Sequence, residues 1–136
     1  MQTYSIVLRI SGKNLDVAEV TAKLRLNPTQ TRIIGGYRSP KSVWDETMWE
    51  YDVRPTGNKV VWDTLEEGLH KLLSTLASRK RILRHYQRRF KVFFWCGHFS
   101  SSFGGPTLSP RLLKALGDFG VELILQSYLC DESDTG

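Results

Sequence analysis

The sequence predicts an α+β fold, a single domain over residues 1–136 with a four-stranded sheet covered by helices on one face. The length and the 40% hydrophobic content suit one globular core and exclude an intrinsically disordered chain. Segments of strand-type residues are interspersed with segments whose apolar residues recur at helical spacing. The first and last thirds of the chain also repeat one order of elements, which is a strand, a Ser/Gly turn, a short helix and a strand.

This repeat predicts two pseudo-symmetric βαβ-like halves joined by a helical segment, a variant of the ferredoxin-like arrangement. Right-handed crossovers would make the two strands within each half parallel. The strand order does not follow from the sequence.

The first half is expected to begin with a strand at residues 3–10, which are rich in β-branched side chains. Asn14 or Asp16 can cap a helix that continues to Leu26, before Pro28 ends it. A long polar connection at residues 27–47 follows, and its length indicates a functional or self-packed loop. Alternation of apolar and polar residues predicts the second strand at residues 49–54.

The second half follows a leucine-rich amphipathic helix, which is expected from Val61 to Leu76. Residues 79–91 continue the helical spacing after a break near Ala77 and Ser78, and residues 92–99 suggest a strand buried on both faces. Ser109, Pro110 and Gly120 have the residue types typical of helix ends, so a helix is expected between them. The last strand covers residues 121–130, and residues 131–136 are expected to form a frayed acidic tail.

The net charge of +5 is concentrated in residues 79–91. This segment holds seven of the nineteen Lys and Arg residues and no acid, while the remaining twelve face fourteen acids. On a helix Arg81, Arg84 and Arg88 lie on one face, away from the apolar stripe. Such a basic face can bind phosphates or an acidic protein, although a solvated helix surface is the simpler interpretation.

Several longer motifs resemble one known family. They are ISGKNLDVAEVTAKLRLNPTQT, the helix EEGLHKLLSTL, and LSPRLLKALGDFGVEL before a terminal strand that contains Tyr128. This pattern resembles domain-of-unknown-function family 4279 of bacteria and phages over nearly the whole chain. The resemblance implies the fold and a bacterial or phage origin. Gln126 stands where members of that family often carry an acidic residue, and no activity comes with the family. Proteins of this size and setting often serve as immunity or accessory proteins in toxin and defence loci, which is an association only.

No catalytic, metal-binding or cofactor-binding motif is found. Cys96, His98 and Cys130 could approach each other, but the spacing of a zinc site and a fourth ligand are missing. The serines at residues 100–102 lie beside His98 but lack the nucleophile-elbow motif, so a flexible loop is the better interpretation. We therefore expect a protein that is not an enzyme and needs no cofactor.

We expect a binding protein of the immunity or inhibitor kind, which occludes a partner protein such as a toxin or nuclease. The candidate contacts are Tyr37, Arg38 and Trp44, of types enriched at interface hot spots, together with Arg81, Arg84 and Arg88. The alternative is a nucleic-acid-binding accessory domain that uses the basic helix of residues 79–91. No window is apolar enough to span a membrane, and the N-terminal residues lack signal-peptide character, so the cytoplasm is expected. The oligomeric state stays open.

Overall fold

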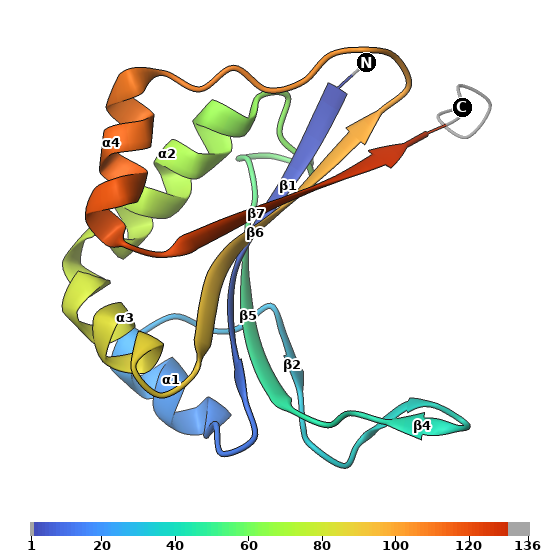
Figure 1. Cartoon of the computed structure of the whole chain (residues 1–136), viewed down its shortest axis with the longest axis vertical. Coiled ribbons are helices and arrows are strands. Elements are labelled where there is room, and N and C mark those ends of the chain that lie inside the picture. Colours follow the sequence, from blue (N-terminus) through green and yellow to red (C-terminus); the bar gives the residue numbers. More distant parts are fainter. Residues whose placement is uncertain (1, 131–136) are drawn as a thin grey trace.

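The protein is described by a computed structural model, which covers residues 2–130. Its main sheet has five strands in the order β2-β5-β1-β6-β7 (Figure 1). The strands are β1 (Gln2–Gly12), β2 (Gln30–Arg32), β5 (Thr47–Val53), β6 (Lys91–Ser100) and β7 (Glu122–Leu129). A second, two-stranded sheet is formed by β3 (Tyr37–Ser39) and β4 (Ser42–Val43). The acidic tail expected at residues 131–136 lies outside the described residues.

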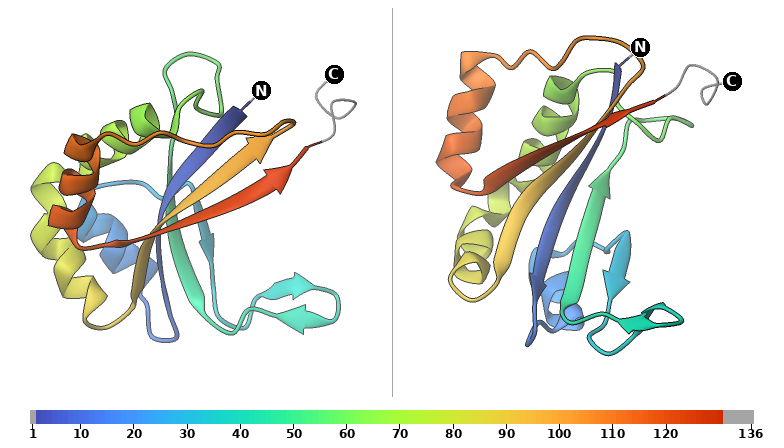
Figure 2. Two further views of the ribbon diagram at one scale, coloured as in Figure 1. Left: turned by 45° about the horizontal axis from the view of Figure 1, so that its top comes forward. Right: turned by 45° about the vertical axis from the view of Figure 1, so that its right-hand side comes forward.

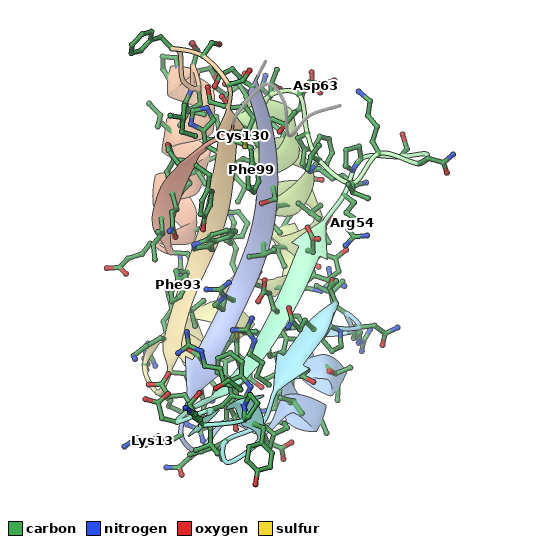
Figure 3. The ribbon with its side chains drawn as sticks, turned by 90° about the vertical axis from the view of Figure 1, so that its right-hand side faces the viewer. Lys13, Arg54, Asp63, Phe93, Phe99 and Cys130 are labelled. Carbon is green, nitrogen blue, oxygen red and sulfur yellow. The ribbon has the colours of Figure 1, made fainter. Side chains whose placement is uncertain are left out.

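All the helices lie on one face of the five-stranded sheet, as expected (Figures 1 and 2). They are α1 (Val17–Leu24), α2 (Leu65–Leu76), α3 (Lys80–Gln87) and α4 (Pro110–Phe119). The short 3-10 helix η1 (Ala77–Arg79) joins α2 to α3, which confirms the predicted break. Within residues 2–130 the opposite face of the sheet carries no helix, and we call it the open face (Figure 3).

The core lies between the helices and the inner face of the sheet. Ile6, Leu8 and Ile10 alternate along the central strand β1 and are fully buried, because every second side chain of a strand faces the same side. Their partners include Leu69 and Leu72 of α2, in one continuous apolar cluster. The apolar side chains that recur at strand spacing in β1 and at helical spacing in α2 therefore pack against each other in this layer.

Helix ends follow the predicted signals closely but not everywhere. Asp16, Thr64 and Ser109 cap the N-termini of α1, α2 and α4, and Gly120 ends α4 in the left-handed region, with φ of 67°. Helix α1 stops at Leu24 rather than Leu26, because Arg25 adopts a left-handed conformation there. Helix α2 starts later than expected, since Trp62 is held in a backbone bridge to Tyr4.

The prediction of four strands in two parallel halves is wrong. The second half is a βαβ unit, because β6 and β7 pair in parallel across α4. In the first half β5 is antiparallel to β1. The strand that runs parallel to β1 is the short β2, and β5 lies between them. The polar connection at residues 27–47 contains β2 and the β3–β4 hairpin. After the hairpin the chain enters β5, which runs antiparallel to β2.

Two helical glycines predict opposite effects of the same substitution. A Cβ atom at Gly68 of α2 would approach Ile6 Cδ1 to 2.0 Å in the core, whereas at Gly117 of α4 it would meet nothing within 4 Å. We expect Gly68→Ala to lower the free energy of unfolding by about 1–3 kcal/mol through overpacking. Gly117→Ala should raise it by about 0.5–1 kcal/mol through helix propensity. Urea denaturation of both variants tests the pair, and equal effects would contradict the packing described for α2.

Candidate binding surfaces

The basic helix is less free than its sequence indicates. Arg81 and Arg84 of α3 and Arg88, the residue that follows the helix, are all exposed, as predicted. The Arg84 guanidinium, however, donates a hydrogen bond of 3.3 Å to the carbonyl oxygen of Asp118, near the C-terminus of α4. A cation in that position compensates the partial negative charge of the helix end. Arg81 and Arg88 form no ion pair within residues 2–130.

Other cations of the same segment also have intramolecular partners. Arg79 donates hydrogen bonds to the carbonyl oxygens of Leu24, at the end of α1, and Thr75, the latter at 2.6 Å. Lys91, the first residue of β6, forms an ion pair of 2.8 Å with Glu46, the residue before β5. The seven cations therefore do not form one free patch, since several of them join neighbouring elements.

The β3–β4 hairpin holds the second group of predicted residues. It projects from the side of the sheet opposite the helices (Figure 1). Backbone hydrogen bonds between Trp44 and the Gly35–Gly36 pair, of 2.8 and 2.9 Å, close its base. Gly35 needs its φ of 85° for this turn, a conformation that glycine adopts without strain. The side chain of Tyr37 is 82% exposed.

Trp44 is half-buried because two arginine side chains lie over its ring. The guanidinium carbons of Arg32 and Arg38 are 4.2 and 5.4 Å from the ring centroid, which is the range of cation–π contacts. We call Arg32, Arg38 and Trp44 the Arg–Trp cluster. The structure thus brings predicted Arg38 and Trp44 together, and it adds Arg32, which sequence reasoning missed. Nothing in the local sequence connects Arg32 to a tryptophan twelve residues later.

The open face carries aromatic side chains that the sequence analysis assigned to the core. Phe93, Trp95 and Phe99 of β6 point to this face and are partly exposed (Figure 3), so the expectation of a strand buried on both faces is wrong. Phe94, by contrast, is fully buried on the helix side. The physical reason is that helices cover one face only, so the strand alternates.

The Arg9 guanidinium group lies against two of these rings. Its guanidinium carbon lies 5.8 Å from the Phe93 ring and 5.3 Å from the Trp95 ring, and its Nε is 3.4 Å from a carboxylate oxygen of Glu50. Further along the face Phe99 stacks on Tyr128 of β7, with ring centroids 5.2 Å apart. The open face is therefore a platform of aromatic rings and an arginine, built on rigid strands.

A hollow of about 350 Å³ joins the Arg–Trp cluster to the open face. Arg9, Arg32, Trp44, Phe93 and Lys91 are among its lining residues. The Nε atom of Arg32 is buried there and has no hydrogen-bond acceptor among the described residues. A buried donor without an acceptor is costly, so an acceptor supplied by a bound molecule would be favourable at this position.

A larger hollow of about 790 Å³ lies at the other end of the sheet, between the 54–63 connection and α2 (Arg54 and Asp63 in Figure 3). Trp62 lines it and donates its indole N–H to the carbonyl oxygen of Val53 at 2.9 Å. Its charges are mixed, and Lys59 pairs with Asp63 at 2.6 Å on the rim. None of the residues selected from the sequence lines this hollow.

The residues considered for catalysis are engaged in structure. The His98 ring is buried and stacks on Tyr4, with centroids 4.9 Å apart, and its two nitrogens face Ser127, at 3.0 Å, and Gln2. The Ser100 hydroxyl donates to the backbone oxygen of Ser102. Burial raises the pKa of the Cys96 thiol to about 12, so this sulfur stays protonated at neutral pH.

Cys96 and Cys130 are both free thiols. Among residues 2–130 no three potential metal ligands converge. Over the same residues, none of the helices has the length and apolar character needed to cross a bilayer.

Comparison with known proteins gives one match. The model of the family described as domain of unknown function DUF4279 matches residues 2–129. Neither the curated proteins nor the solved structures contain a match to this chain.

The contacts of the basic segment predict that two neighbouring arginines differ in their effect on stability. Arg79→Ala leaves the carbonyl oxygen of Leu24 without this donor and should lower the free energy of unfolding by about 2–3 kcal/mol. Arg81→Ala is expected to stay within about 0.5 kcal/mol of the wild type. Chemical denaturation measures both values. If Arg81→Ala proved the more destabilising of the two, the assignment of Arg79 as a structural residue would be incorrect.

The burial of Cys96 predicts selective thiol chemistry. In the native protein a thiol reagent at neutral pH should label Cys130 and leave Cys96 unreacted, because Cys96 is buried and protonated. Both thiols should react in denaturant. Mass spectrometry of the labelled peptides distinguishes the two sites, and rapid native labelling of Cys96 would contradict its position.

Proposed function

The chain belongs to the DUF4279 family, whose description assigns no activity, and we propose that it is a non-enzymatic binding protein of the immunity or inhibitor kind. In this proposal it occludes the surface of a partner protein, such as a toxin or nuclease of a bacterium or phage. The binding surface is the Arg–Trp cluster with the β3–β4 hairpin and the adjoining part of the open face.

The single observation that carries this proposal is the uncovered Arg–Trp cluster beside aromatic residues on the open face. Tryptophan, tyrosine and arginine are the residue types enriched at the energetic centres of protein interfaces. Arg32 and Arg38 each contact the Trp44 ring, Tyr37 is exposed on the same hairpin, and Phe93 lines the 350 Å³ hollow. Backbone hydrogen bonds fix the hairpin base, so less conformational entropy is lost on binding.

The charges near the cluster favour an acidic partner by a small excess, because Arg9, Arg32 and Lys91 line the hollow together with Asp45 and Glu46. Arg9 and Lys91 each pair with a carboxylate of this chain. Arg32 and Arg38 belong to no ion pair within residues 2–130. A carboxylate of a partner protein would pair with these two guanidinium groups.

Nucleic-acid binding through the basic helix is the second candidate. The observation that favours it is that Arg81 and Arg88 are exposed and have no acidic partner in the described part of the chain. Against it, Arg84 is engaged at the end of α4. The aromatic rings that could stack on bases lie on the open face, whereas α3 lies on the other side of the sheet (Figure 1).

The test begins with purification of a stoichiometric complex from the source cell and its reconstitution from the two purified proteins. We expect Trp44→Ala to weaken the reconstituted complex by roughly thirtyfold or more, as for a hot-spot residue. The matched control is the double variant Arg81→Ala/Arg88→Ala, which should bind the partner as the wild type does. Titration calorimetry measures both affinities.

The opposite pattern would reject the proposal. If Trp44→Ala binds normally while the double variant loses affinity for single-stranded or duplex nucleic acid, the basic helix is the functional surface. In that case the affinity should fall steeply with salt, with a shallower slope in the double variant.

A further inference from the structure

Strand β7 forms an edge of the sheet, and apolar side chains are exposed along it. Ile124, Leu125 and Tyr128 are 38–41% exposed, and Leu129 is 87% exposed. Edge strands are normally protected from pairing by short length, Lys, Pro or a bulge. The eight residues of β7 contain neither Lys nor Pro, carry one charge at Glu122, and pair with β6 in an unbroken register. The other edge, β2, has only three residues and includes Arg32.

In β7 the backbone N–H and C=O groups of every second residue point toward this edge of the sheet. The N–H of Cys130 donates to the Ser100 carbonyl oxygen of β6 at 2.7 Å, so the backbone groups of Cys130 face inward. Because N–H and C=O directions alternate along a strand, the opposite set faces outward. That set consists of Leu123, Leu125, Ser127 and Leu129.

We propose that the chain forms a homodimer in which two copies of β7 pair antiparallel about a twofold axis at Gln126. In this register Leu123 lies opposite Leu129 of the second copy, and Leu125 lies opposite Ser127. Every residue whose backbone groups face the edge then meets another such residue. The two sheets become one continuous sheet, and the dimer does not depend on the function proposed for the hairpin.

The side chains of β7 are suited to pairing with β7 of a second copy of the chain. On the open face Ile124 lies opposite Tyr128 of the other copy, which gives an apolar pair, and Gln126 meets its own equivalent. On the helix side Leu129, the most exposed of the four apolar residues, is covered by Leu123. The only charge, Glu122, lies at the start of the strand and is separated from its equivalent by the length of β7. A strand with so little charge offers no electrostatic selection of a different protein, whereas it fits itself without opposing like charges.

The test is a charge swap at the axis. Gln126→Lys and Gln126→Glu each place like charges directly opposite each other, so each variant alone should dimerise roughly fivefold more weakly than the wild type. An equimolar mixture of the two should restore a dimer of one Lys and one Glu chain. Sedimentation equilibrium gives the three constants. Lys114→Glu on the exposed face of α4 is the control and should leave dimerisation unchanged.

A covalent trap tests the register independently. In a Cys130→Ser background, Gln126→Cys should form an intermolecular disulfide under mild oxidation, because directly opposed residues in this position have Cα atoms close enough for a disulfide bond. Arg111→Cys on α4 should not. A wild-type chain that sediments as a monomer throughout the micromolar range would overturn the proposal, as would a mixture of the charge variants that fails to associate better than either alone.

Discussion

The central strand β1 is the constraint on which the rest of the structure depends. It pairs antiparallel with β5 on one side and β6 on the other, while its inner side chains pack on the helices. Since all the helices lie on that inner side, the same strand displays Arg9 on a surface that nothing in the described chain covers. One-sided coverage thus places the core on one side of the sheet and an aromatic platform on the other.

Local sequence patterns predicted most helices and strands, but they did not predict which strands pair when those strands are distant in the sequence. The abundance of β-branched residues located β1, alternation located β5, and the caps at Asp16 and Ser109 located two helices. The hairpin was missed because strands of two or three exposed residues have no measurable period. The direction of β5 was wrong because the insertion of β5 between β1 and β2 is decided by tertiary packing.

The candidate site was predictable in its residue types but not in its arrangement. Tyr37, Arg38 and Trp44 were selected because such residue types bind proteins. Arg32, the remaining member of the Arg–Trp cluster, comes from the other end of the connection. A run of cations in the sequence was similarly misleading. Arg79 and Arg84 are directed to the C-terminal carbonyl groups of two different helices, which favour positive charge. Proximity in the sequence therefore does not establish a common surface.

The position of β1 also has a consequence for biosynthesis. Gln2 lies opposite Ser100 in the sheet, so one side of β1 has no partner until β6 has been translated. Contacts of such sequence separation slow folding and prolong the exposure of apolar strands. A premature stop before β6 therefore leaves a strand with buried isoleucine and leucine side chains without its neighbour.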